Sequence, residues 1–312
     1  MRHILKIAIS SIVFLAAALA ADAYVSSWRP IKILAIGNSF SCDAVDNHLF
    51  ELTKAAGKNI IIGNAYIGGC TLEKHLKCAH ENLASYSYTI QYADGSKSHK
   101  KNITLDAALA DEEWDYITFQ QQSGRSGIYE TWEASLPALL DYVKSKVSTH
   151  VTFMIHQTWA YDENSTNGGF NHYYRSQEIM YESIVKAVSA ASKLTGISRI
   201  IPSGTAIQNA RYTALDRFGK AGHLVYDGYH LHEGIAPFIE GLCVAQVVMK
   251  HYGVEVDVQK SRLRITPEWR KERRTPEPHG EPEEAIEEDY ATAMRCAKWA
   301  LESPWQLTVV EQ

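Results

Sequence analysis

The chain has 312 residues, of which 46% are hydrophobic and 21% are charged, as in an ordinary globular protein. Its formal net charge is −5, from 31 basic and 36 acidic residues, and the basic residues form no stripe, which argues against nucleic acid as a partner. A chain of this length can bury a large core within one domain.

Residues 1–23 have the pattern of a secretory signal peptide. Arg2 and Lys6 precede an apolar run at 7–20, and small residues at 18–23 offer cleavage sites. The apolar run is shorter than the roughly 20 residues that a membrane-spanning helix needs. We therefore expect a secreted or periplasmic protein with a single domain at 24–312 and no stable membrane insertion after cleavage. The alternative is an uncleaved N-terminal anchor.

Short apolar runs then alternate with helical patterns along most of the chain. The patterns predict strands at 31–36, 60–62, 116–119, 151–155 and 197–201, and helices at 43–56, 72–83, 131–146, 175–195, 234–252 and 285–302. Such alternation predicts an α/β fold, with a parallel sheet covered on both faces. Active sites of such sheets lie beyond the carboxyl ends of the strands, so residues directly after strands are the functional candidates.

Two segments depart from this alternation. Residues 85–104 predict a β-hairpin insertion, because Asp94-Gly95 is a strong hairpin turn signal between two alternating runs. Residues 265–284 are rich in proline and charge and predict a solvated surface connection to the last helix. Neither segment carries a repeat.

Ser39 is the first chemical candidate, because it lies in G-N-S-F-S at 37–41, directly after the first strand and before a helix. A backbone N–H at a helix N-terminus stabilises developing negative charge there. The alternative is that serine, asparagine and glycine serve only the turn and the helix cap.

Asp227 and His230 form the second candidate. A serine hydroxyl becomes a good nucleophile when a histidine accepts its proton and a carboxylate orients that histidine. An aspartate three residues before the histidine can supply that carboxylate locally. His230 and His232 could instead be metal ligands, but no set of acidic or cysteine partners accompanies them.

Two further strand ends can supply donors to an oxyanion. The first carries Gly68 and Gly69, where glycine lets backbone N–H groups approach a ligand closely. The second carries the amides Gln120 and Gln121 within Q-Q-Q-S at 120–123. A plain glycine turn and a polar loop without a role are the alternatives.

These segments resemble motif blocks of the SGNH (GDSL-like) hydrolases. G-N-S-F-S at 37–41 is similar to the first block, N-A-Y-I-G-G at 64–69 to the second, and D-G-Y-H at 227–230 to the fifth. The chain departs from the third block, G-x-N-D, in which an asparagine is expected. A glutamine is an equivalent donor, so Gln121, and after it Gln120, is the expected replacement.

The resemblance is strongest to the DUF4886 group within these hydrolases. It rests on W-D at 114–115 with Q-Q at 120–121, on I-P-S-G-T-A at 201–206 and on D-G-Y-H-L at 227–231. The resemblance implies a flavodoxin-like three-layer α/β/α sandwich with a five-stranded parallel sheet. It also implies ester hydrolysis through an acyl-enzyme without a metal or organic cofactor.

In the implied mechanism, His230 removes the proton of Ser39 and is oriented by Asp227. The oxyanion is bound by the N–H groups of Ser39 and Gly69 and by the Gln121 side chain. For substrate binding we expect Trp159 and Tyr161, from the loop after the fourth strand, and Asn209 and Arg211, from the segment after the fifth.

The expected substrate is an O-acetylated carbohydrate, because an aromatic and polar rim suits a sugar. Two alternatives stay open. One is an esterase or thioesterase acting on lipid or small acyl substrates, and the other is a non-catalytic glycan-binding protein on the same fold.

Overall fold

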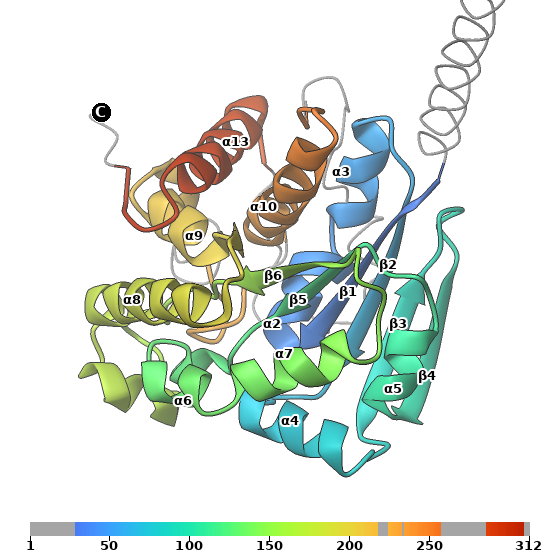
Figure 1. The fold of residues 1–312 in the computed structure, drawn as a ribbon. Helices are drawn as coiled ribbons and strands as arrows, with labels where there is room; N and C mark the ends of the chain where they lie inside the picture. The colour runs from blue at the N-terminus through green and yellow to red at the C-terminus, as the bar shows by residue number, and fades with distance from the viewer. Residues whose placement is uncertain (1–28, 218–223, 233, 257–284, 309–312) are drawn as a thin grey trace, which may run out of the picture.

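The computed structural model describes residues 29–217, 224–232, 234–256 and 285–308. The predicted signal peptide (1–23) and charged connection (265–284) lie outside the described residues. A seven-stranded sheet in the order β4-β3-β2-β1-β5-β6-β7 forms the centre of the described part (Figure 1). The predicted parallel sheet is confirmed: it consists of β1 (Ile31–Gly37), β2 (Ile60–Tyr66), β5 (Tyr116–Phe119), β6 (Thr152–His156) and β7 (Arg199–Ile201).

The predicted hairpin extends this sheet at one edge. Strand β3 (Tyr86–Gln91) pairs antiparallel with β2, and β4 (Lys97–Ile103) pairs antiparallel with β3. The turn uses Gly95 at φ +91°. The outer strand is largely exposed and carries three lysines, which discourages pairing with a further strand from another molecule.

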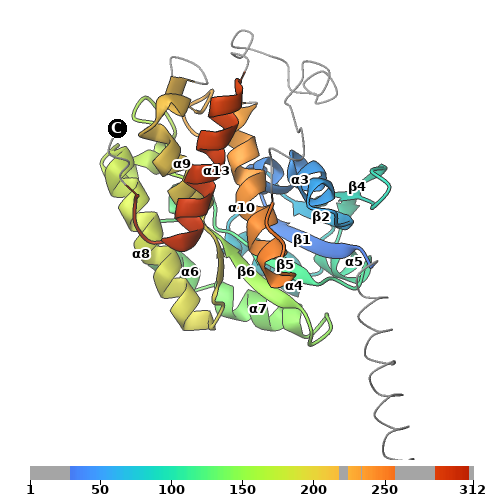
Figure 2. The same cartoon turned by 90° about the horizontal axis from the view of Figure 1, so that it is seen from above.

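Helices cover both faces of the sheet (Figures 1 and 2). One face carries α4 (Leu72–His80), α5 (Leu105–Ala110), α6 (Tyr129–Glu133), α7 (Leu136–Lys144) and α8 (Gln177–Thr195). The other carries α3 (Leu49–Ala55) and α10 (Ile235–His251), while α9 (Ser203–Arg211) and α13 (Glu287–Glu302) pack against α10. No helix in the described ranges is both long and apolar enough to cross a membrane.

The helix predicted at 43–56 differs from the observed structure. The chain turns helical already at α2 (Ser39–Ser41), continues as a π-helical turn η1 (Cys42–Asp46), and is interrupted before α3. The helix predicted at 131–146 is divided into α6 and α7, because Pro137 lies in the first turn of a new helix. Short 3₁₀ turns η2 (Ser123–Arg125), η3 (Gly168–Tyr173) and η4 (Ala214–Arg217) lie in the connections.

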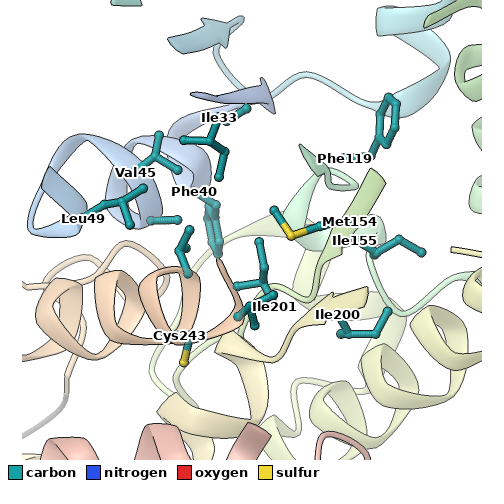
Figure 3. Packing of buried hydrophobic residues seen from close by; sticks show 14 of the residues in the cluster. Ile33, Phe40, Val45, Leu49, Phe119, Met154, Ile155, Ile200, Ile201 and Cys243 are labelled. Atoms are coloured by element: carbon teal, nitrogen blue, oxygen red, sulfur yellow. The ribbon is translucent and has the colours of Figure 1, made fainter. Parts of the chain in front are cut away.

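The hydrophobic core fills both interfaces between sheet and helices. Figure 3 shows Ile33, Phe119, Met154 and Ile155 from the strands, with Phe40 beside them from the start of α2. Phe40 is 1% exposed, so the residue that follows Ser39 is anchored in the core. All five cysteines are free thiols, four of them buried.

Candidate active site

The first strand and the turn that follows it position Ser39. β1 is buried along almost its whole length and ends at Gly37. The Asn38 side chain then caps the helix, because its Oδ1 accepts a hydrogen bond from the N–H of Phe40 at 3.1 Å. Ser39 is the first residue of the helix, where a backbone N–H has no acceptor within the helix. Its hydroxyl and its N–H therefore lie at the carboxyl edge of the sheet.

The structure brings Ser39 and His230 together, although 191 positions separate them. His230 Nε2 lies 2.9 Å from Ser39 Oγ, and His230 Nδ1 lies 2.7 Å from Asp227 Oδ2. The two side chains of the pair are 22% (His230) and 29% (Asp227) exposed, so the site is open to a ligand. This is the arrangement that a serine nucleophile, a general base and an orienting carboxylate require.

Asp227 is fixed by its own turn. Its Oδ1 accepts hydrogen bonds from the N–H groups of Tyr229 (3.1 Å) and His230 (2.7 Å). Burial by itself raises the pKa of Asp227, but these bonds and the His230 ring together hold its pKa below its ordinary value. The carboxylate therefore stays ionised at neutral pH and favours the Nδ1–H tautomer of His230.

Gly228 makes this turn possible. It adopts φ +90°, and a Cβ there would lie 2.6 Å from the Cα of Ser165. The N–H of Asp162 donates to the Gly228 carbonyl at 2.8 Å. The loop after β6 therefore holds the Asp227–His230 turn against the sheet edge.

The turn after β2 carries Gly69, the second predicted backbone donor. Gly68 and Gly69 are exposed, and Gly69 adopts φ +58°. Asn38 connects this turn to the nucleophile, because its Nδ2 donates to the Cys70 carbonyl at 3.0 Å. One side chain thus contacts both segments that carry the predicted backbone donors, Ser39 and Gly69.

The prediction for Gln121 and Gln120 as oxyanion donors is wrong. The Gln121 amide nitrogen donates to Thr131, and its oxygen accepts from the N–H groups of Leu72 and Gln122. Gln120 is 2% exposed and donates to Asn38 Oδ1 at 2.6 Å. Both amides are committed to internal hydrogen bonds. Sequence shows that an amide follows a strand, but not in which direction it points.

The prediction for Trp159 and Tyr161 as substrate contacts is also wrong. Both are 0% exposed. Trp159 stacks on Phe40 with ring centroids 4.0 Å apart and donates its indole N–H to the Tyr229 carbonyl at 2.7 Å. The Tyr161 hydroxyl lies 2.7 Å from Ser123 Oγ. These large buried rings support the loop that carries His230 and do not form a rim around the site.

Asn209 is likewise internal and Arg211 is half-buried, and both side chains are hydrogen-bonded to other parts of the protein, which corrects the remaining substrate-binding predictions. The segment after β7 is the helix α9. Asn209 is 2% exposed and accepts from the N–H of Thr308 at 3.0 Å. Arg211 donates to the Ala160 carbonyl at 2.9 Å and to Gln208, and burial lowers its pKa to about 10.

Two tyrosines that the sequence analysis did not single out flank the histidine instead. The ring centroids of Tyr226 and Tyr229 lie 5.8 Å and 4.2 Å from that of His230, and both side chains are half-buried. Tyr229 also contacts Tyr161, with centroids 5.4 Å apart. The available signal was that Tyr229 lies within the D-G-Y-H motif and that Tyr226 directly precedes it.

His230 is not arranged as a metal ligand, because both of its ring nitrogens face protein groups. Across the described ranges, no group of three or more histidine, cysteine, aspartate or glutamate side chains could hold a metal ion. His232, the other candidate ligand, belongs to no such group within these ranges.

Comparisons with known proteins identify the family. Residues 32–262 match the model of a family described as a domain of unknown function, DUF4886. A DUF4886 family protein from Bacteroides uniformis ATCC 8492 has a similar crystal structure, with 38% identity, a TM-score of 0.76, and coverage of 90% of this chain and 98% of that chain.

More distant likenesses involve two other solved structures. A proposed SGNH hydrolase from Slackia heliotrinireducens has 19% identity and a TM-score of 0.48, covering 70% of this chain and 100% of that chain. Axe2, an acetylxylan esterase from Geobacillus stearothermophilus, has 14% identity and a TM-score of 0.45, covering 73% of this chain and 97% of that chain. No curated protein matches the sequence. Since the family model matches most of its length, the chain belongs to the DUF4886 family.

Proposed function

We propose that this protein is a secreted serine esterase that hydrolyses carboxylic esters, with Ser39 as nucleophile, His230 as general base and Asp227 as its orienting carboxylate. The observation that carries the proposal is the continuous pair of hydrogen bonds, 2.9 Å from Ser39 Oγ to His230 Nε2 and 2.7 Å from His230 Nδ1 to Asp227 Oδ2. Secretion rests on the signal-peptide pattern of residues 1–23.

The reaction proceeds in two displacements. His230 accepts the proton of Ser39 while Oγ attacks the ester carbonyl, and Asp227 stabilises the imidazolium that forms. The oxyanion is bound by the N–H groups of Ser39 and Gly69. His230 then protonates the departing alcohol, and water attacks the acyl-enzyme by the reverse route, so that the carboxylic acid leaves and Ser39 regains its proton.

Gln122 is the third donor that best fits the site. It is the one amide of 120–122 whose side chain remains partly exposed, and it contacts the hydroxyl of Tyr161. Tyr161 in turn contacts Tyr229 beside His230. This contact links Gln122 to the aromatic side chains beside His230, whereas the Gln120 and Gln121 amides are bound to Asn38 and Thr131.

The substrate we propose is an O-acetyl group on a carbohydrate. The half-buried rings of Tyr226 and Tyr229 flank the general base and offer apolar faces on which a sugar ring can stack, with hydroxyl groups at their rims. A long-chain acyl ester, a thioester, or glycan binding without catalysis are the competing possibilities that the experiments below separate.

Removing the nucleophile and the base tests the mechanism. In hydrolysis of p-nitrophenyl acetate, Ser39→Ala and His230→Gln should each lose nearly all activity, a decrease on the order of 10⁴-fold or more in kcat. His232→Gln is the matched control, because His232 lies two residues further along the same segment and is assigned no role in the proposed reaction. Unchanged activity in Ser39→Ala would remove the mechanism, and a large loss with a chelator would revive a metal site.

Two substrate series test the acyl and alcohol groups. Release of acetate from acetylated xylan should depend on Ser39, and activity on p-nitrophenyl esters should fall as the acyl chain lengthens. A strong preference for acyl chains of about eight carbons or more would reject the acetyl-carbohydrate proposal, while leaving the serine esterase intact. Binding of xylan without any hydrolysis of either substrate would favour the non-catalytic alternative.

A further inference from the structure

A chain of buried polar side chains runs behind Ser39 and has no place in the proposed reaction. It comprises residues at the ends of two strands and in two helices, each at most 2% exposed: Gln120 after β5, His156 at the end of β6, Ser203 at the start of α9 and Glu240 in α10. Burying polar groups costs free energy unless they are hydrogen-bonded, and a core position is normally apolar. The presence of these four polar side chains in the core therefore needs a physical explanation.

The hydrogen bonds fix the orientation of the side-chain amides of Asn38 and Gln120. The Asn38 Oδ1 atom must be oxygen, because the N–H of Phe40 donates to it, and Nδ2 donates to the Cys70 carbonyl. The end of Gln120 that faces Asn38 Oδ1 at 2.6 Å must then be its NH₂ group. The Gln120 oxygen is consequently turned toward His156 Nδ1, 3.0 Å away, which must carry a proton.

The other side of His156 faces a buried carboxyl group. Its Nε2 lies 3.2 Å from Glu240 Oε2 and 3.1 Å from Ser203 Oγ. With Nδ1 protonated, an ionised Glu240 opposite a bare Nε2 lone pair would be an unpaired buried charge, which is strongly unfavourable. One proton therefore lies between Nε2 and Oε2, either as imidazolium and carboxylate or as imidazole and carboxylic acid. In both forms the pair has no net charge and Nδ1 donates to Gln120.

Ser203, His156 and Glu240 have the composition of a second triad but not its geometry. Both Ser203 and Glu240 contact the same ring nitrogen, so the carboxyl group cannot orient the ring from the opposite side. All three are buried from solvent. The cluster consequently has no access to a substrate and acts through its neighbours.

From this geometry we infer that Gln120, His156 and Glu240 are positioning residues for the oxyanion hole. The inference rests on the proposed function. Asn38 contacts both backbone segments that carry the donors of Ser39 and Gly69. Glu240 keeps the proton on His156 Nδ1, His156 keeps the oxygen of Gln120 turned away from Asn38, and Gln120 therefore keeps its NH₂ group on Asn38 Oδ1. Reversal of the Gln120 amide would place two oxygens against each other and displace Asn38.

Two double variants isolate the decisive donor. Glu240→Gln removes the buried acid without stranding a charge and serves as the background. In that background, His156→Asn keeps an amide N–H close to the place of ring Nδ1, whereas His156→Leu has no donor. The two variants therefore differ in whether Gln120 is held, and both are compared with the background for kcat and KM on p-nitrophenyl acetate and for melting temperature.

The expected results separate positioning from folding. His156→Leu should lower kcat about 10- to 100-fold and change KM less than about 3-fold, because misplaced donors stabilise the transition state less but leave substrate binding unchanged. His156→Asn should keep kcat within about 3-fold of the background. Hydrogen–deuterium exchange of the amides at 38–42 and 69–71 should accelerate in His156→Leu alone, a readout that needs no substrate.

Each outcome bears on the inference. A folded His156→Leu variant with background kcat and unchanged amide exchange overturns it, as does an equal loss of kcat in His156→Asn. If Ser39→Ala is inactive while His156→Leu is fully active, the esterase proposal stands and only positioning fails. If the leucine variant does not fold, Gln120→Met gives the same test, because methionine has nearly the length of glutamine but no N–H group to donate to Asn38. An unchanged kcat in that variant overturns the inference.

Discussion

Acid should destabilise this protein through His75, which lies in α4 under the sheet edge that carries Ser39. His75 is 0% exposed, its ring stacks on Tyr86, and its Nδ1 lies 2.9 Å from the Tyr86 hydroxyl. Burial, reinforced by the nearby charge of Lys74, lowers its pKa from 6.5 to about 3, although the Gly37 carbonyl acts in the opposite direction. The folded protein therefore keeps this ring neutral where the unfolded chain protonates it.

The sign and size of the effect follow from proton linkage. Because the pKa is lowered on folding, the unfolded chain binds more protons between about pH 6.5 and 3, and the free energy of unfolding decreases as pH falls through that range. The full difference of 3.5 pKa units, from 6.5 to about 3, corresponds to about 5 kcal/mol. Between pH 7 and pH 5 the expected loss from His75 alone is about 2 kcal/mol.

Urea unfolding at pH 7 and pH 5 measures this loss. His75→Phe keeps the ring stacked on Tyr86 but cannot titrate, so its free energy of unfolding should change less between the two pH values than that of the wild type, by about 2 kcal/mol. His172→Gln is the control, because His172 is exposed and loses little hydration on folding. An equal pH dependence in wild type and His75→Phe would show that the ring is not held neutral and would refute the reasoning.

Three further predictions concern the active site. In Gly69→Ala the Cβ has open space, but an alanine is strained at φ +58°, so kcat should fall about 10-fold or more. Gly57→Ala is the control, because its Cβ also has open space and its φ of +73° strains the backbone similarly, but it lies far from the site and should keep its activity. Equal kcat in both variants would contradict the oxyanion role of Gly69. Asp227→Asn should fold and lower kcat by about 10³- to 10⁴-fold in steady-state assays, and a loss below 10-fold would argue that Asp227 only shapes the turn. Gln122→Leu should lower kcat by about 10-fold or more at similar KM, whereas unchanged kinetics would leave only the two backbone donors.

The sequence predicted the sheet and the meeting of Ser39 with His230 for one physical reason. Parallel strands end at a common edge, so residues that directly follow different strands or precede a nearby helix converge there. The apolar runs at 31–36 and 116–119 were clear enough to locate those ends. The Asp227–His230 pair needed no long-range information beyond this, because its hydrogen bond lies within one turn.

The substrate-binding residues could not be predicted in the same way. The segment after β7 was expected to supply Asn209 and Arg211 as polar substrate contacts because it follows a strand, yet every residue of α9 from Ser203 to Ala210 is buried against neighbouring helices. Trp159 and Tyr161 lie in the predicted loop, but both are fully buried, because their large rings are mainly apolar and each has a single polar group that a protein partner can satisfy. Position relative to a strand is encoded locally, while burial depends on helices far along the chain.

The distribution of buried polar groups separates the two ends of the sheet. Asn38, Gln120 and His156 lie at the carboxyl ends of neighbouring parallel strands, Asn64 lies near the end of β2, and each is at most 2% exposed, whereas most of the buried residues earlier in these strands are apolar. Stability alone would favour apolar side chains at these positions, because satisfied buried polar groups add little to the free energy of folding. A network that instead fixes the direction of each amide suits the proposed oxyanion hole, in which the N–H groups of Ser39 and Gly69 act together. The polar edge is therefore better explained by the proposed positioning of the oxyanion hole than by the fold.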